Sequence, residues 1–416
     1  MRKTTLGFAY LAWLVAVPVF AQPATPAQAT PDVMVPANIA AGTGAPTSTM
    51  LVSAPAVEAP EAAESNRVWV AGDYMLRWLK PVCLTVPVVT IGNPANAIPG
   101  AIGQPGTGVV VGEHKFEFKG LSGARVTAGT WLATDPLVSF EASGFLLPRA
   151  TARQEFVASN GSPASYLAFQ TPTNTQDAIP FTIPGVVDGR SVATGSSQLW
   201  GVEANLTCGF AAPQRNVELR GTLLLGFRYL DLHDRVQVSH FLNPVGAPTS
   251  IAFGEDEFTT RNQFYGPQVG CKLGLNWGKC SLEYITKMAA GNTHQVSIVN
   301  GNPLIVGSAA DPTLVPGPLL ALPSNLGRLA SNRPTLAPEL ALRFHWQVTD
   351  HLVLSLAYEL LYWNKILCPG DQMDPHANIT QLPGQGPVVG PLVPAPMLDH
   401  TDFFAQGLDA GLEVRY

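Results

Sequence analysis

The stretch VELRGTLLLGFRY, which spans Val217–Tyr229, alternates between two kinds of side chain with a period of two. One face carries apolar and aromatic side chains with one glycine, and the other face carries Glu218, Arg220 and Arg228. A period of two is that of a β-strand, and a strand with one apolar face and charges on the other is typical of a barrel wall between lipid and lumen. This stretch therefore predicts a transmembrane β-strand.

Nine further segments share this alternation, so we predict a barrel of ten strands. They are Arg67–Leu79, Ser122–Thr134, Val138–Leu147, Gly195–Phe210, Asp256–Asn276, Lys279–Gly291, Leu336–Trp346, Leu352–Tyr362 and Thr401–Tyr416. Long and short connections alternate without exception, as in outer-membrane barrels with long external loops and short periplasmic turns. The predicted fold class is all-β, a transmembrane antiparallel up-and-down β-barrel over residues 67–416.

The composition fits a protein with an apolar outer surface. Of the 416 residues, 46% are hydrophobic and only 13% are charged, with a net charge of -6. A soluble chain of this size normally carries nearer ~25% charged residues. The acidic balance excludes a basic nucleic-acid binder, so we expect no nucleic-acid partner. No apolar run after the N-terminus reaches the ~18 residues of a spanning helix without a break, which leaves a β-barrel in contact with membrane lipid.

The N-terminal residues have the layout of a secretory signal. Arg2 and Lys3 precede an apolar stretch, and Val19-Phe20-Ala21 places small residues around a cleavage point before Gln22. We predict a signal peptide over residues 1–21. Residues 22–66 are rich in Ala and Pro and cannot bury a core, so they predict a disordered periplasmic linker.

The last strand ends in an aromatic residue, which resembles the recognition signal of bacterial outer-membrane proteins. Its apolar positions alternate with Asp409, Gly411, Glu413 and Arg415. We interpret these apolar positions as the barrel-assembly signal, read by a barrel-assembly machinery in the cell outer membrane. They include Phe404, Leu408, Leu412, Val414 and Tyr416.

The face of the predicted strands opposite the apolar one carries basic and acidic side chains in nearly equal number, which predicts a charged lumen. Interleaved signs favour a cross-linked interior over an ion-selective pore, and ten strands lie just above the ~8 whose interior side chains fill. A packed or nearly closed lumen is therefore favoured over a narrow conducting path. The predicted lumen charges are Asp73, Arg77, Arg125, Glu141, Glu203, Glu218, Arg220, Arg228, Lys272, Glu283, Lys287, Glu339, Arg343, Glu359 and Asp409.

One tight turn predicts a specific ion pair. If Trp277-Gly278 forms a two-residue hairpin turn, Lys272 lies directly opposite Glu283 on the lumen face. The same register places Cys271 opposite Tyr284 on the apolar face.

The predicted external loops are unusually poor in charge. Residues 82–112 and 375–398 carry none, and residues 296–327 carry only Asp311. Loops rich in Val, Leu and Pro need a surface to cover, so we expect them to pack on one another over the barrel mouth. Neighbouring envelope proteins are a second, compatible set of partners. Cys83 and Cys368 begin two of these loops, and a bridge between them stays open.

The sequence offers little chemistry. Two rim clusters combine acids with histidines, but neither has the spacing of a nucleophile and its base, so a rim-site surface hydrolase ranks last and we expect no enzyme. No CxxC, HExxH or Asp-rich calcium loop occurs, so no metal and no cofactor are expected. The clusters are Asp231, His233, Asp234 and His240, and Asp399, His400 and Asp402.

Ten short motifs resemble those of the planctomycete outer-membrane β-barrel proteins of the BBP class seven type, a family formerly classed as a domain of unknown function. They are GQPGT (103–107), FEASGFLL (140–147), LWGVEANL (199–206), GFRYLDL (226–232), TRNQFYGPQVG (260–270), THQV (293–296), LALPSNLGR (320–328), QVTDHL (347–352), LYWN (361–364) and PGDQMD (369–374). The resemblance implies a porin-like surface barrel and supplies neither a substrate nor catalytic residues. We therefore expect a structural or permeability role in the cell envelope, with a narrow porin-like solute channel as the alternative.

Overall fold

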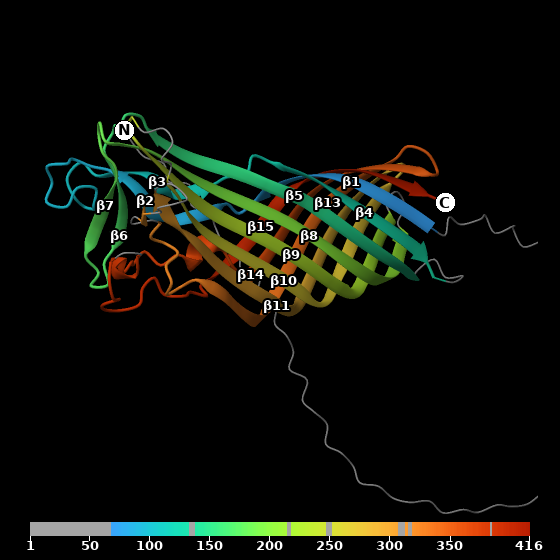
Figure 1. The fold of residues 1–416 in the computed structure, drawn as a ribbon. Helices are drawn as coiled ribbons and strands as arrows, with labels where there is room; N and C mark the ends of the chain where they lie inside the picture. The colour runs from blue at the N-terminus through green and yellow to red at the C-terminus, as the bar shows by residue number, and fades with distance from the viewer. Residues whose placement is uncertain are drawn as a thin grey trace, which may run out of the picture. The chain divides into compact units, whose positions relative to one another are not determined.

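Ten antiparallel strands form a closed ring in the computed structural model, which describes residues 68–132, 138–213, 218–246, 252–306, 313–314, 318–382 and 385–416. Neighbours in the ring are neighbours in the chain, and β1 pairs with β15 to close it (Figure 1). The predicted up-and-down barrel is confirmed. Its strands are β1 (Val68–Leu79), β4 (Leu121–Trp131), β5 (Val138–Ala158), β8 (Val187–Pro213), β9 (Glu218–Pro244), β10 (Ala252–Trp277), β11 (Cys280–Val306), β13 (Gly327–Gln347), β14 (Leu352–Leu367) and β15 (His400–Arg415).

An apolar band surrounds the lower part of the barrel, at the end that holds the C-terminus. Leu223, Leu225 and Phe227 of β9 are 59%, 61% and 51% exposed on its outer face. A continuous band of apolar side chains around the outside of a barrel is typical of contact with lipid. Trp78, Tyr265 and Phe404 are among the exposed aromatics at the upper edge of the band. No helix in the described part of the chain is long and apolar enough to cross a membrane.

Above the band the alternation continues with its two faces exchanged. In β9 the residues that follow Tyr229 place apolar side chains inside and polar ones outside. Leu232, Val236 and Val238 are at most 1% exposed, because the interior here is a dry core and the outer face meets water. The polar residues that alternate with them on the outer face are Asp231, His233, Arg235 and Gln237.

The external loops are shorter than predicted, because the strands continue beyond the point where their two faces exchange. Residues 148–158, 187–194, 233–244, 252–255, 292–306 and 327–332 were expected in external loops, yet they extend β5, β8, β9, β10, β11 and β13. The prediction followed apolar residues on the outer face, and that pattern stops at the edge of lipid although the strands do not. The barrel therefore projects well beyond its apolar band.

A second sheet covers the end of the barrel opposite the C-terminus (Figure 1). It has four strands, β2 (Val82–Ile91), β3 (Gly108–Phe116), β6 (Ser165–Gln170) and β7 (Gln176–Thr182), in the order β3-β2-β6-β7. Two short 3-10 helices, η1 (Pro369–Gln372) and η2 (Ile379–Gln381), lie in the connection from β14 to β15. The two-residue strand β12 (Thr313–Leu314) pairs antiparallel with the end of β11. The connecting segments thus pack over the barrel mouth, as their composition predicts.

The β10–β11 turn differs from its predicted position by one residue. Trp277 pairs with Cys280, so Gly278 and Lys279 form the turn. Gly278 has a φ of 58°, and a type II′ hairpin turn requires a positive φ at its first central residue. The prediction placed this glycine second, which is why the pairing of Lys272 with Glu283 and of Cys271 with Tyr284 was wrong.

Three sequence predictions lie outside the described residues. They are the signal peptide over 1–21, the linker over 22–66, and the short turn at Asp135 between β4 and β5.

Candidate functional site

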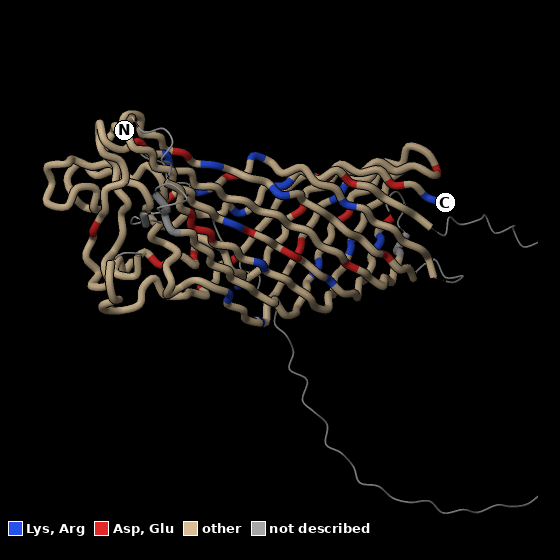
Figure 2. Tube along the Cα trace, viewed as in Figure 1, with Lys and Arg blue, Asp and Glu red and all other residues tan. Residues whose placement is uncertain are grey.

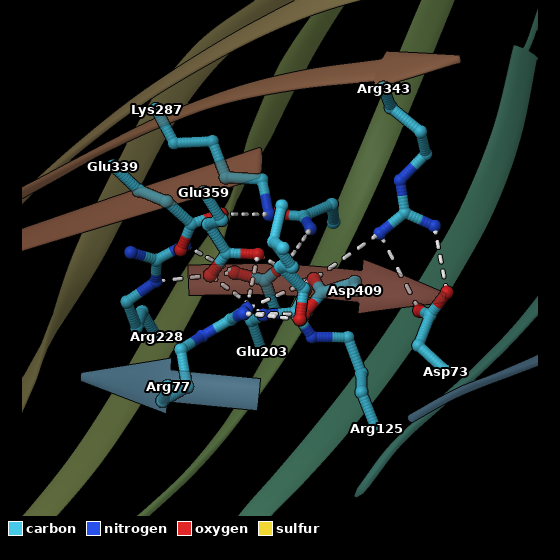
Figure 3. A network of polar contacts seen from close by, with 12 residues as sticks. Asp73, Arg77, Arg125, Glu203, Arg228, Lys287, Glu339, Arg343, Glu359 and Asp409 are labelled. Atoms are coloured by element: carbon cyan, nitrogen blue, oxygen red, sulfur yellow. Dashed lines mark hydrogen bonds and ion pairs between the residues drawn. The ribbon is translucent and has the colours of Figure 1, made fainter. Parts of the chain in front are cut away.

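The lumen inside the apolar band holds a network of charged side chains from all ten strands of the ring, which we call the charged lumen network. Figure 2 shows these charges spread along the barrel, whereas the covering sheet and loops carry few. Figure 3 shows the side chains pointing toward one another across the interior. The members of the charged lumen network are Asp73, Arg77, Arg125, Glu141, Glu203, Arg228, Lys272, Lys287, Glu339, Arg343, Glu359 and Asp409.

One group of the network links the closing strands β1 and β15 with their neighbours β4 and β14. Arg77 of β1 binds both carboxylate oxygens of Asp409 on β15, at 2.5 and 2.9 Å. Arg125 of β4 binds both oxygens of Glu359 on β14, at 2.7 and 2.8 Å. Arg77 also lies 3.1 Å from Glu359, so the two pairs form one unit. Bidentate pairs of this kind fix the relative position of the strands that carry them.

The same unit includes Arg343 of β13. Its guanidinium lies 3.0 Å from Asp73 and 3.9 Å from Asp409. Along the β13–β14 hairpin Arg343 faces Ala357, which places it diagonal to Glu359. Its ion pairs nevertheless go across the lumen to Asp73 and Asp409.

A second group lies on the opposite wall. Arg228 of β9 is 2.6 Å from Glu203 of β8 and 2.7 Å from Glu339 of β13. Lys287 of β11 contacts the same two carboxylates at 2.5 and 3.1 Å. Two cations therefore share two anions, and the Arg228 side chain is only 2% exposed.

Lys272 has a different partner from the predicted one. Its ammonium lies 2.7 Å from Glu141 of β5, which is across the lumen from β10. Glu283 instead lies 3.7 Å from His345, nearer the end of the barrel that holds the C-terminus. Glu218 and Arg220 pair with each other at 3.0 Å on the rim, with side chains 36% and 61% exposed, and they do not join the network.

The network is electrically neutral and nearly solid. It contains six basic and six acidic side chains, and each described ion pair within it joins opposite charges. The cavity lined by Arg125, Arg228 and Lys287 has a volume of about 10 Å³. That is roughly the space that one water molecule needs. A neutral, filled lumen has no charge preference to offer a passing ion.

Above the network an apolar plug fills the projecting part of the barrel. Barrel residues Leu230, Phe264 and Trp363 pack in one cluster with Val89 of β2 and Leu322 of the segment before β13. Trp363 is fully buried, donates from Nε1 to the Thr293 hydroxyl at 3.1 Å, and meets Phe264 edge to face. Sequence analysis missed this plug, although the exchange of apolar parity after Tyr229 was a visible signal.

Three polar residues on the inner face of β10 anchor the segment before β13 and the upper end of β14. Asp256 accepts the backbone N–H groups of Leu320 and Ala321, at 3.2 and 3.0 Å. Asn262 donates to the Leu367 carbonyl and accepts its N–H, and the Thr260 hydroxyl donates to the same carbonyl. Burial raises the pKa of Asp256 to about 7, against the effect of the two backbone donors. The sequence gives no periodic signal for such anchors.

The acid and histidine clusters do not converge on one site. In β9, Asp231 and His233 lie on the outer face, while Asp234 and His240 lie on the inner face among apolar side chains. Burial raises the pKa of Asp234 to about 7 and lowers that of His240 to about 4. His400 contacts Gln295 at 2.9 Å, and Asp402 accepts the Lys365 backbone N–H.

The cysteines and the described acids form no further centre. All five cysteines are free, including Cys83 and Cys368. Within the described ranges, no three His, Cys, Asp or Glu side chains are grouped so that they could hold a metal ion.

The last strand occupies the closing position of the ring. Phe404, Leu408 and Leu412 are 44%, 43% and 44% exposed on the outer face of β15, and Tyr416 is 72% exposed. Val414 pairs with Val70 of β1 on one side and Leu352 of β14 on the other. The predicted assembly residues thus share one lipid-facing edge of the closure.

A closed antiparallel barrel with an apolar outer band and a charged lumen is a porin-like outer-membrane barrel. A family model described as "Putative beta barrel porin-7 (BBP7)" matches residues 69–416, so the chain belongs to this family. The comparison with curated proteins finds no match.

Solved outer-membrane barrels resemble the chain distantly. The outer membrane protease OmpT of Escherichia coli is 8% identical, with 85% of this chain and 98% of that one covered, at a TM-score of 0.42. A Pseudomonas aeruginosa FadL homologue is 8% identical over 85% and 90%, at a TM-score of 0.20. The P. putida toluene transporter TodX is 8% identical over 85% and 91%, at a TM-score of 0.15.

Proposed function

We propose that the protein is an integral barrel of the cell outer membrane whose lumen is closed, with a structural or permeability-limiting role in the envelope. The observation that supports this proposal is that two layers, the charged lumen network and the apolar plug, fill the lumen one above the other. The charged lumen network fills the part inside the apolar band, and the apolar plug fills the part above it. An ion would have to break buried ion pairs and then cross a dry core, and both steps are costly.

The outer membrane as location follows from the outer surface. The apolar band with aromatic residues at its edges suits a bilayer, and the polar outer face of the projecting strands suits water beyond it. The short turn at Gly278 would then face the periplasm and the covering sheet would face outside.

A narrow solute channel is the second candidate. It has support in the porin description of the family and in the anchoring of the plug. The segment before β13 is held by two backbone hydrogen bonds to Asp256 of β10, and it can be released without breaking the ring. A rim hydrolase ranks behind both. The first candidate cluster is divided between opposite faces of β9, and in the second His400 contacts Gln295 while Asp402 accepts the Lys365 N–H.

Neighbouring envelope proteins are proposed partners of the outermost loop. Val388, Val389 and Leu392 are 51%, 67% and 64% exposed there. Apolar side chains that protrude from an outer loop suit contact with another apolar surface. Membrane lipid and the barrel-assembly machinery are the other expected partners.

Planar-bilayer recording on the refolded full chain tests the closed lumen. We expect no steady single-channel conductance from the wild type at moderate voltage. Heat-modifiable migration of the same sample would show that the barrel is folded and inserted. Stable conductance steps from folded protein would replace the closed barrel with the channel candidate.

A further inference from the structure

A row of hydrogen-bond donors crosses four strands on the outer face of the barrel, just above the apolar band. Gln198 of β8 pairs with His233 of β9, which pairs with Arg261 of β10. Arg149 lies on β5 at an irregularity in its pairing with β8, between the Leu147 and Ala150 pairs. It reaches over β8 to His233, with 3.2 Å between Nη2 and Nδ1. We call Arg149, Gln198, His233 and Arg261 the outer arginine row.

The height of this row relative to the membrane follows from the register. Along β9, Asp231 lies two residues below His233, and Tyr229 lies two residues below Asp231. Tyr229 faces Tyr265 on β10. Trp200 of β8 stacks on Tyr229 at 5.2 Å, so an aromatic cluster marks the edge of the band here. Each two-residue step is about 7 Å along a strand. The row therefore lies at the level of lipid headgroups, which is where aromatic belts end.

The row offers donors and an excess of positive charge. Arg149 donates to Nδ1 of His233, since a guanidinium can only donate, and burial together with Arg149 and Arg261 lowers the pKa of the ring. The Nε2–H group remains as a further donor. Arg261 is balanced by Asp231 at 2.6 Å, but Arg149 is exposed and has no carboxylate partner among the described ion pairs.

We infer that the outer arginine row binds the phosphate of an anionic lipid headgroup in the outer leaflet. Guanidinium groups match phosphate oxygens in geometry and charge, and the uncompensated charge of Arg149 supplies the attraction. The inference rests on the proposed membrane placement of the band, but it is independent of whether the lumen conducts. It commits to a membrane lipid, because the row faces outward at headgroup depth.

Lipid binding by the full-length folded protein tests the inference. The probe is phosphatidylglycerol, added to detergent-solubilised barrel and counted by native mass spectrometry, with phosphatidylcholine as the zwitterionic comparison. We expect Arg149→Gln to weaken phosphatidylglycerol binding at least about tenfold, the effect of losing a charge-assisted hydrogen bond. Arg153→Gln is the matched control, since Arg153 lies on the same strand and pairs with Glu155 at 2.6 Å.

Each other outcome would overturn the inference. Equal losses from Arg149→Gln and Arg153→Gln would mean general surface charge, and equal binding of phosphatidylcholine would mean an annulus of ordinary lipid. Competition by millimolar inorganic phosphate that removes the lipid would mean a free-phosphate site. Failure of wild type to insert into vesicles of either lipid would overturn the membrane placement itself, which separates that failure from loss of the lipid site.

Discussion

Arg228 shows why single charges in this lumen have large effects. Its guanidinium is almost completely buried between Glu203 and Glu339, and Lys287 contacts the same carboxylates. A buried ion pair contributes little net stability, because the cost of desolvation offsets the attraction. Removal of one partner is nevertheless costly, because it leaves the other as an unpaired buried charge. The network is therefore better understood as a device that specifies one arrangement of the strands than as a source of stability.

A double-mutant cycle should identify the partner of Lys272. Glu141→Ala leaves a largely buried ammonium unpaired, so we expect a loss of roughly 3 kcal/mol in the free energy of unfolding, with Lys272→Ala restoring part of it. Glu283→Ala should couple to Lys272→Ala less strongly, because Glu283 lies beside His345. The measurement is urea unfolding of the folded barrel. A larger coupling with Glu283 would support the alternative turn at Trp277-Gly278.

Strands β9 and β10 each contain two parts that bury apolar side chains on opposite faces. Their lower parts place leucines outside against lipid, and their upper parts place leucine, valine and phenylalanine inside against the covering segments. Hydrogen-bonded pairing runs without a shift from Leu219 to Leu242 between the two strands. The solvent on each side, not the backbone, changes along the strand.

The anchor at Asp256 should make the covering segment sensitive to pH. Burial raises its pKa to about 7 from the ordinary 3.8, so the neutral carboxyl is the stable form in the plug. Its contribution is complete below about pH 4 and is lost as the pH rises through 7. Among the groups around it, Leu320 and Ala321 donate to it, and Glu255 adds a repulsive charge.

Hydrogen exchange of the peptide over residues 318–326 would measure this effect. After correction for intrinsic rates, we expect protection to fall between pH 5 and pH 8 in the wild type. Asp256→Asn should flatten the profile, because an amide cannot ionise. Glu257→Gln, on the outer face of the same strand, should keep the wild-type profile. A flat profile in the wild type would exclude Asp256 as the titrating anchor.

The barrel as a unit combines two seals of opposite chemistry. The charged layer lies where the outside is lipid, and the apolar layer lies where the outside is water. The plug opposes the passage of ions, because a charge is costly in an apolar core. The charged lumen network opposes the passage of apolar solutes, because they gain no favourable contact there. The closed lumen that we propose follows from this stacking and needs no gate.

Labelling on whole cells would check the orientation of the barrel. Ser159 lies exposed at the tight turn that pairs with Ser162 above β5, and Lys279 lies in the β10–β11 turn at the opposite end. In a variant that lacks the native thiols, Ser159→Cys should react with an impermeant maleimide and Lys279→Cys should react only after lysis. Reaction of Lys279→Cys on intact cells would invert the topology.

The sequence by itself determined the strand number, the lipid-facing parity and the ring order, since all three follow from local alternation and connection length. The period-two pattern of Leu219 to Phe227 shows which side chains face lipid, and neighbouring strands with short turns must pair. The same parity puts charged side chains such as Arg77 and Lys272 on the inner face.

Only the tertiary structure decided which charges meet. Arg125 binds Glu359 across 234 positions of sequence, and Lys272 binds Glu141 across 131. Such partners depend on the closure of the ring and on the tilt and stagger of its strands, which no local period encodes. The plug has the same origin, because residues such as Val89 and Leu322 are buried only once the ring gives them an interior to fill.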